Sequence, residues 1–319
     1  MINIVYSKTK TYNGIRAYSE NLFSDMSKVK TTKFIPLPKI EISLFNKKIG
    51  GWTTQQLLSW QVNAFGIVHS TSHWDLVRNT NIVTIHDLYP IIYPEIYKIT
   101  NRIEKFYKKT LMKVQNRAKA IIVQSPHIKD QVDKFIKDIP VYSIPTKIFT
   151  EDTNFNPYPN DGKLHLITMG EIHGDLANRK RIFELYDWVA NNPEVDLYHI
   201  GRITDPKYFN YASNIHRVGS VTQEQKFGYL KYADKFVFKT LGEGQGLPTM
   251  EAMKLGTQVV VNDLPEHRFF LGDKPYYYET KDEFLEAIYK PKKQGLSEQI
   301  GQYDNWIEKY FKVYEEVIK

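Results

Sequence analysis

The sequence predicts an α/β protein built from two doubly wound domains. Short runs of β-branched and aromatic residues alternate with longer amphipathic patterns along all 319 residues. This alternation is typical of parallel sheets covered by helices on both faces. It occurs in two series, one on either side of a segment at 150–163 that is rich in Asn, Asp and Pro. We expect that segment to be a linker, so the chain divides into two domains.

The first series alternates apolar runs with helical patterns such as "IRAYSENLFSDMSK". A second helix is predicted over 98–119, where apolar residues recur at helical spacing on an otherwise basic segment. The expected strands span 2–6, 33–37, 66–70, 81–87, 120–125 and 141–145. The expected apolar stripe of the helix consists of Ile99, Ile103, Tyr107, Leu111, Val114 and Ala118.

The second series follows the linker, with a helical pattern "KRIFELYDWVANN" after its first strand. An amphipathic helix at 303–319 closes the sequence. The domains are therefore expected at 1–149 and 150–302. The expected strands span 164–170, 195–201, 215–219, 235–240, 257–262 and 276–279.

Composition restricts the class of protein. The chain has no cysteine, which excludes disulfides, zinc–thiolate sites and thiol nucleophiles. No apolar run approaches the roughly 20 residues that span a bilayer, and the first residues read as a strand rather than a signal peptide. We expect a cytoplasmic protein.

Charge is unevenly distributed between the two halves. Residues 1–150 carry a balance of +12, whereas the remainder carries −5. A basic half favours an anionic partner such as a lipid-linked acceptor, a membrane surface or a nucleic acid. An ordinary accumulation of surface lysines is the alternative, so peripheral membrane binding stays open.

The stretch "LGEGQGLPTMEAMKLG" at 241–256 has the strongest local pattern. Gly242, Gly244 and Gly246 permit positive φ and close backbone approach after an apolar strand. Pro248 suits a first helical turn, and Gly256 suits the C-terminal end of the helix. A glycine-rich turn that leads into a helix at the carboxyl end of a parallel strand is typical of an anion site.

Two carboxylates, Glu243 and Glu251, lie in this stretch. With "YNGIRAYSENL", "IVTIHDLYP" and "AIIVQSPHIKDQV" in the first half, "EGQGLPTME" resembles the retaining glycosyltransferases of the GT-B fold, in the GT4-like group (glycosyl transferases group 1). The resemblance extends over nearly the whole chain. It implies two Rossmann-like domains that face each other across a cleft, with the helix at 303–319 crossing back onto the first domain.

The resemblance also implies roles for individual residues. Glu251 would bind the ribose of a nucleotide sugar, and Glu243 would contact the transferred hexose. The remaining donor-binding residues would be Gly14, Arg179, Arg181, Val218, Gly244, Gly246 and Leu247. Lys180 would hold the diphosphate and His86 would lie near the reacting centre, so that His86, Glu243 and Lys180 form the catalytic set.

One position departs from the family pattern. Glu171 stands where the family places an arginine after the first strand of the second domain. A carboxylate there would repel phosphate, so we expect Glu171 to point away or an arginine of "RKR" at 179–181 to take over the contact.

The expected reaction moves a hexose from a nucleotide-diphosphate sugar, such as a UDP- or GDP-hexose, to an acceptor hydroxyl. The sequence has no D-x-D triplet, so we expect no metal, and no cofactor beyond the co-substrate. The acceptor would be a glycolipid, polysaccharide or glycoprotein glycan.

Other functions stay open at this point. The chain could transfer glucose to nucleic acid, although no nucleic-acid-binding motif supports this. It could also be a non-catalytic nucleotide-sugar binder or an epimerase of the same fold. A dinucleotide turn is the weakest alternative, because Leu247 replaces the third glycine of that motif.

Overall fold

The computed structural model describes residues 1–8, 14–38, 41–44, 47–50, 66–97, 100–172, 179–204 and 211–318. The chain forms two compact units. The first comprises Met1–Ile92, Ile99–Thr146 and Asn305–Lys319, and the second comprises Tyr93–Lys98 and Lys147–Asp304. Among the described helices, none combines the length and the apolar character needed to cross a membrane.

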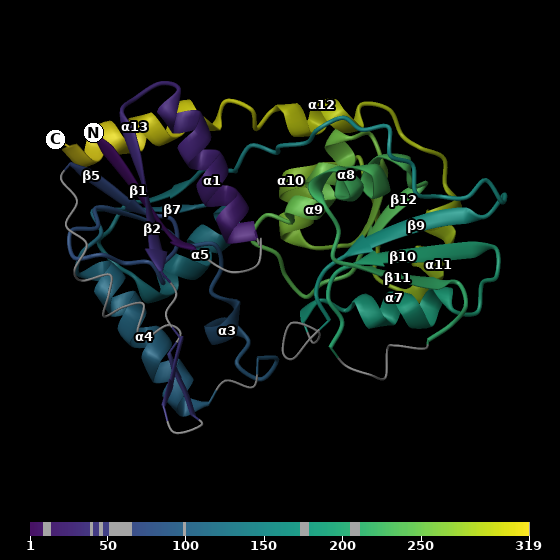
Figure 1. Cartoon of the computed structure of the whole chain (residues 1–319), viewed down its shortest axis with the longest axis horizontal. Helices are drawn as coiled ribbons and strands as arrows, with labels where there is room; N and C mark the ends of the chain where they lie inside the picture. Colours follow the sequence, from purple (N-terminus) through teal and green to yellow (C-terminus); the bar gives the residue numbers. More distant parts are fainter. Residues whose placement is uncertain are drawn as a thin grey trace. The chain divides into compact units, whose positions relative to one another are not determined.

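The first unit contains a six-stranded parallel sheet with the order β2-β1-β5-β6-β7-β8. Its strands β1, β2, β5 and β7 are labelled in Figure 1. The order reverses between β1 and β5, which makes that point the topological switch of the sheet. The strands are β1 (Ile2–Lys8), β2 (Thr32–Pro38), β5 (Ile67–Ser70), β6 (Ile82–Thr84), β7 (Ala120–Val123) and β8 (Val141–Ser143). The helices are α1 (Gly14–Ser27), α3 (Tyr89–Ile92), α4 (Asn101–Gln115), α5 (Pro126–Phe135) and α13 (Trp306–Ile318).

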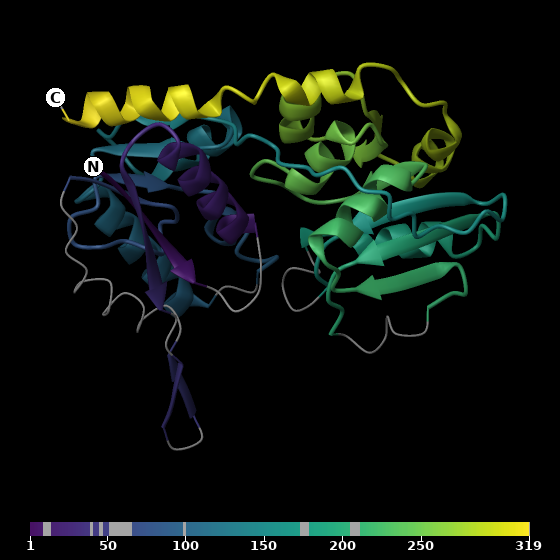
Figure 2. The ribbon, with the colours of Figure 1, turned by 45° about the horizontal axis from the view of Figure 1, so that its top comes forward.

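An antiparallel hairpin extends away from this sheet (Figure 2). It pairs β3 (Glu41–Leu44) with β4 (Lys47–Gly50). The sequence analysis did not predict this hairpin, because each strand has only four residues and no Asn-Gly or Asp-Gly turn joins them.

The stripe predicted on the basic helix is confirmed at four positions and wrong at one. Tyr107, Leu111, Val114 and Ala118 are buried, but Ile103 is exposed. Helix α4 begins at Asn101, where Thr100 caps it by accepting a hydrogen bond from the Ile103 amide. Ile103 therefore lies in the first turn, which the sheet does not cover. Ile99 lies outside the described residues.

The second unit contains another six-stranded parallel sheet, with the order β11-β10-β9-β12-β13-β14. Its switch point lies between β9 and β12, where a doubly wound sheet binds its ligands. The strands are β9 (Leu164–Met169), β10 (Val195–Ile200), β11 (Ile215–Gly219), β12 (Lys235–Phe238), β13 (Gln258–Asn262) and β14 (Tyr276–Tyr278). The helices are α7 (Ile182–Val189), α8 (Gln223–Tyr232), α9 (Leu247–Lys254), α10 (Pro265–Leu271), α11 (Lys281–Tyr289) and α12 (Leu296–Gly301).

Both sheets are as the sequence predicts. Strand β12 is buried at every position, as expected of a central parallel strand. Two core clusters cover the two faces of this sheet. One contains Phe236 and Phe238 with α8 and α9, and the other contains Val237 with α7 and α11. The α/β class and the two doubly wound domains are therefore confirmed.

Candidate functional site

The segment 179–181 lies beside the chain that follows β12. The Leu241 amide donates to the Arg179 carbonyl at 3.0 Å, and the Arg181 amide donates to the Lys239 carbonyl at 3.1 Å. Because 179–181 follows β9 in sequence, these bonds bring the ends of β9 and β12 together at the switch point. The basic segment and the glycine-rich turn therefore share one edge of the sheet.

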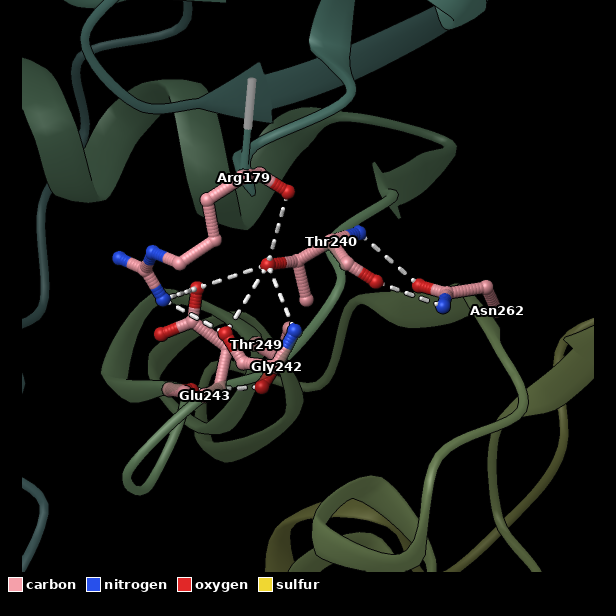
Figure 3. A network of polar contacts seen from close by, with 7 residues as sticks. Arg179, Thr240, Gly242, Glu243, Thr249 and Asn262 are labelled. Carbon is pink, nitrogen blue, oxygen red and sulfur yellow. Dashed lines mark hydrogen bonds and ion pairs between the residues drawn. The ribbon is translucent and has the colours of Figure 1, made fainter. Parts of the chain in front are cut away.

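Arg179 holds the turn in place (Figure 3). Its guanidinium donates to the Gly242 carbonyl at 2.6 Å and to Glu243 Oε1 at 3.1 Å. Thr240 donates through its hydroxyl to the Gly242 carbonyl at 3.1 Å, and Asn262 fixes the Thr240 backbone through bonds of 3.1 and 2.8 Å. The segment that carries Arg179 and the chain that follows β12 thus orient the Glu243 carboxylate before any ligand binds.

Glu243 is an ionised carboxylate in this arrangement. Burial raises the pKa of its carboxyl, but the Arg179 and Lys180 cations outweigh that effect and hold the pKa below its usual value. Its exposed side-chain fraction is only 12%, as is that of Arg179. The site therefore presents a paired, desolvated carboxylate able to accept hydrogen bonds.

Lys180 is the second cation at this edge. Burial lowers the pKa of its ammonium, and the nearby Glu243 opposes that shift. Its Nζ lies 5.4 Å from the centre of the Phe238 ring. A Cβ at Gly170, which has φ 154°, would lie 2.9 Å from Lys180 Cδ, so this glycine provides room for the lysine. An anionic ligand would stabilise the charged form of such an amine.

The third residue of "RKR" has another partner. Arg181 precedes α7 and forms an ion pair with Glu184 on the same helix. Lys239 binds the other oxygen of Glu184 at 2.7 Å. Arg179 and Lys180 therefore face Glu243, whereas Arg181 does not share this network.

Glu171 is engaged by an arginine that sequence reasoning missed. Arg202, which follows β10, lies 3.4 Å from the Glu171 carboxylate. This pair offsets the negative charge of Glu171 next to the lysine. Arg202 could have been noticed in the sequence, because it stands in "GRI" at the end of a predicted strand. The sequence does not show which neighbouring strand end the side chain of Arg202 contacts.

The glycine-rich turn enters α9 through Gly246. Of the three glycines predicted to permit positive φ, only Gly246 adopts it, at φ 72°. Leu247 and Pro248 occupy the first helical turn and Gly256 ends the helix at φ 85°, both as predicted. The Thr249 hydroxyl donates to the Gly246 carbonyl at 2.6 Å. Gly244 lies in the bend between Glu243 and Gly246.

Glu251 lies one turn inside α9 and is paired with Lys226 of α8 at 2.9 Å. Burial raises the pKa of the Glu251 carboxyl, and Lys226 opposes that shift. Lys226 was missed by sequence reasoning, because its relation to Glu251 depends on how α8 packs on α9. Val218, near the end of β11, packs against the core cluster that includes Met250 and Phe227.

Gly14 and His86 belong to the first unit. Gly14 is exposed and begins α1, which follows β1. His86 follows β6, and its Nε2 donates to the Thr71 carbonyl at 2.8 Å. Burial lowers the pKa of His86 to about 4, with the Thr71 carbonyl opposing. His86 is therefore a neutral imidazole near pH 7.

His73, which lies near His86, is expected to make the first unit less stable in acid. Both its ring nitrogens are buried without a hydrogen-bond partner, and burial lowers its pKa to about 3. The unfolded chain binds the proton below pH 6.5, so the unfolding free energy falls as pH falls towards 3. Between pH 7 and pH 5, the unfolding free energy of His73→Phe should fall by about 2 kcal/mol less than that of the parent. Denaturant unfolding at both pH values measures this. At pH 8 the two proteins should differ only by the change in packing. If the unfolding free energy of His73→Phe fell with pH below 6.5 as steeply as that of the parent, the role of His73 would be contradicted.

Comparison with known proteins adds a family to this geometry. Residues 166–290 match the model of the family described as glycosyl transferases group 1. The chain is 23% identical to the O-antigen chain mannosyltransferase RfbU of Salmonella typhimurium over 255 residues, which cover 76% of this chain and 69% of that protein.

Solved structures share the fold over the full length. Sucrose-phosphate synthase from Thermosynechococcus elongatus has a TM-score of 0.75 at 15% identity, over 100% of this chain and 99% of that one. Anabaena HepE, solved in complex with UDP and glucose, has a TM-score of 0.69 at 11% identity, over 99% of each chain. The second unit thus matches the glycosyl transferases group 1 model over residues 166–290, and the whole chain has the GT-B fold of these glycosyltransferases.

Proposed function

We propose that this protein is a retaining glycosyltransferase of the GT4-like group, which moves a hexose from a nucleotide-diphosphate sugar to an acceptor hydroxyl. The observation that carries the proposal is the constellation at the switch point of the second sheet. There Arg179, Lys180 and Glu243 meet beside the N-terminus of α9. The constellation offers cations and backbone amides to a diphosphate, and carboxylates to hydroxyl groups.

The diphosphate is the group that suits Lys180. Burial lowers the pKa of the half-buried Lys180 ammonium, and an approaching phosphate stabilises its charged form. The amide of Leu247, at the start of α9, adds a donor for an anion at a helix N-terminus. Pro248 has no amide hydrogen, and the amides of Thr249 and Met250 donate to the Gly246 carbonyl. Gly244 and Gly246 allow the ligand to approach the backbone, since neither carries a side chain.

The two carboxylates bind the neutral parts of the donor in this proposal. Glu251 accepts hydrogen bonds from the ribose hydroxyls, and Lys226 pairs with its carboxylate at 2.9 Å and opposes the rise in pKa that burial causes. Glu243 accepts them from the hexose, and Arg179 fixes its orientation. Val218 lies where the base would meet the backbone of β11. Arg181 would need to leave Glu184 to reach the donor, so its contribution is the smallest of the basic residues.

The chemistry requires stabilisation of the leaving group. The anomeric C–O bond breaks, positive charge develops on the sugar, and negative charge develops on the departing diphosphate. Lys180 and the N-terminus of α9 stabilise that charge without reorganising. The acceptor oxygen forms the new bond on the same face of the sugar, and its proton passes to a phosphate oxygen. His86, which is neutral, would contact the reacting sugar, and Gly14 would approach the diphosphate through its amide.

The acceptor that we propose is a glycan hydroxyl, first of all on a lipid-linked glycan. Two observations support it. The relative RfbU is named as an O-antigen chain mannosyltransferase, and residues 1–150 carry the basic charge that an anionic membrane surface attracts. Peripheral binding at the cytoplasmic face of the membrane follows from this proposal.

A thermal-shift screen identifies the donor. We expect one of UDP, GDP or ADP, with its hexoses, to raise the melting temperature selectively, because a ligand that binds only the folded state stabilises it. Glu251→Gln should remove most of the increase, since the amide loses the charge that binds the ribose. Glu298→Gln, on α12, is the matched control. No shift with any nucleotide sugar at millimolar concentration would refute the proposal.

The transfer step is expected to need no metal. Lys180, Arg179 and the N-terminus of α9 supply the positive field that a metal supplies elsewhere. The initial rate of transfer, measured well below the melting temperature, should therefore be the same with and without EDTA. Loss of the rate in EDTA and its recovery with Mg²⁺ would show that this part of the proposal is wrong.

A further inference from the structure

Three adjacent strands of the second sheet carry a metal-ligating side chain at their second residue. These residues are His165 in β9, Asp196 in β10 and His216 in β11. Asp196 is registered with His165, and His216 is registered with Tyr198, two residues beyond Asp196. Side chains two apart on a strand share a face, so all three lie on the same face at the amino-terminal edge. The proposed donor site follows the carboxyl ends of this sheet.

A fourth side chain reaches this edge from the segment before β9. Asp161 Oδ1 lies 3.2 Å from His165 Nε2, and Asp196 Oδ1 lies 3.4 Å from His216 Nε2. The ligand atoms of Asp161, His165 and Asp196 all lie within 4.8 Å of one another. Two ligands at zinc-binding distance in a tetrahedral site are about 3.3 Å apart. The separations of 3.2 and 3.4 Å match that spacing, and His216 joins the group through Asp196.

The histidine nitrogens at this edge are buried without hydrogen bonds. His165 is 7% exposed, and its Nε2 has no hydrogen-bond partner, although it faces Asp161. His216 Nε2 also lacks one. A buried polar atom without a partner costs free energy, and a neutral imidazole nitrogen is the commonest metal ligand. Stacking on Tyr158 at 5.1 Å and on Tyr198 at 4.5 Å fixes the two rings.

The charge of the cluster also suits a cation. Two carboxylates are accompanied by one ammonium, because Lys163 Nζ lies 3.1 Å from Asp196 Oδ1. Asp196 is 3% exposed, so its charge is poorly solvated. Lys163 is more exposed and can withdraw into solvent.

We propose that Asp161, His165, Asp196 and His216 form a binding site for a divalent transition metal, with Zn²⁺ as the best match. Two imidazoles and two carboxylates suit Zn²⁺, whereas Mg²⁺ and Ca²⁺ prefer oxygen ligands alone. The metal would fasten the segment that enters the second unit to three strands of its sheet. Lys163 neutralises Asp196 when no metal is bound.

Metal binding by the full-length protein tests this proposal. Protein stripped with EDTA and dialysed is titrated with Zn²⁺ by calorimetry, and with Co²⁺ by the visible absorption of a tetrahedral complex. We expect one ion per chain and a higher melting temperature with Zn²⁺. Asp161→Asn, an exposed change that leaves the core intact, should weaken binding by about tenfold or more. Lys163→Gln should tighten it by about tenfold, because a competing positive charge is removed.

The variants also define the results that overturn the proposal. Asp152→Asn, in the same segment but paired with Lys231, is the matched control and should bind as the parent does. Absence of saturable Zn²⁺ and Co²⁺ binding overturns the site, as does binding that is unchanged in both Asp161→Asn and His165→Gln. Equal affinity for Mg²⁺ and Zn²⁺ would show that the histidine nitrogens do not bind the metal. None of these measurements depends on glycosyl transfer.

Discussion

Lys180→Met is expected to lower kcat/KM for glycosyl transfer by about 10²–10³-fold, the usual effect of removing one preorganised charge-stabilising group. The ammonium is half-buried near Glu243 at the switch point, so its field on a developing diphosphate charge is only partly screened. The Met side chain keeps the length and apolar character of the lysine stem. Initial rates with the donor found in the thermal-shift screen, at several acceptor concentrations, measure the effect.

The stability of the same variant separates a lost function from a lost fold. Burial lowers the pKa of Lys180, which means that the folded protein disfavours its charge. Lys180→Met should therefore unfold at or above the melting temperature of the parent. Lys239→Met is the matched control, because that lysine is also largely buried near the end of β12 but binds Glu184. Equal loss of activity in both variants would remove Lys180 from its assigned role.

Trp306→Ala is expected to destabilise the first unit by about 3–5 kcal/mol, the range for deleting a large buried aromatic side chain. Trp306 is 1% exposed and packs edge-on against Tyr310 with ring centres 5.3 Å apart. Its Nε1 donates to Asp25 Oδ2 on α1 at 3.0 Å. The substitution leaves a cavity and removes one donor from the Asp25 carboxylate, which keeps its ion pair with Lys28 at 2.8 Å. Denaturant unfolding followed by circular dichroism measures the change.

A conservative variant shows which of these contacts dominates. Trp306→Phe keeps most of the apolar ring but loses the bond to Asp25, so we expect a loss of only about 1 kcal/mol beyond packing effects. If Trp306→Ala cost less than Trp306→Phe, the proposed cavity would not exist.

The sequence analysis predicted every strand of the two sheets but could not define their ends. Strand β6 was expected over 81–87 and is regular only at Ile82–Thr84. Its apolar run continues to Ile85, yet the strand ends at Thr84. The neighbouring strand β5 pairs with β6 only as far as Ser70, opposite Val83. Strand length depends on the neighbouring strand, and no local pattern contains that information.

The residues of the donor site were predicted from sequence, but their partners were not. Resemblance suggested Glu243, Glu251 and Lys180, and the structure brings Lys180 and Glu243 together. The pair Arg179–Glu243 joins positions 64 apart, and Lys226–Glu251 joins positions 25 apart. Such contacts depend on how the helices and loops pack on the folded sheet, which no local sequence pattern contains. The roles of these residues in binding and transfer remain predictions.

The aromatic residues of α13 do more than pack by apolar contact. The Tyr310 hydroxyl bonds to the Tyr18 hydroxyl at 2.8 Å, and the Tyr314 hydroxyl bonds to His69 Nδ1 at 2.6 Å. All four side chains are buried. Tyrosine carries an apolar ring with a polar tip, and the tips here form a network that only the assembled unit reveals.

The course of the backbone affects how the protein is made. The chain leaves the first unit after Thr146 and returns to it at Asn305. A ribosome therefore releases the whole second unit before α13 emerges, and Trp306 and Tyr310 reach α1 last. Nascent domains usually mature in order from the N-terminus, but here the N-terminal unit matures last. Until α13 is synthesised, the surface around Tyr18 and His69 lacks the tyrosines that cover it in the folded unit.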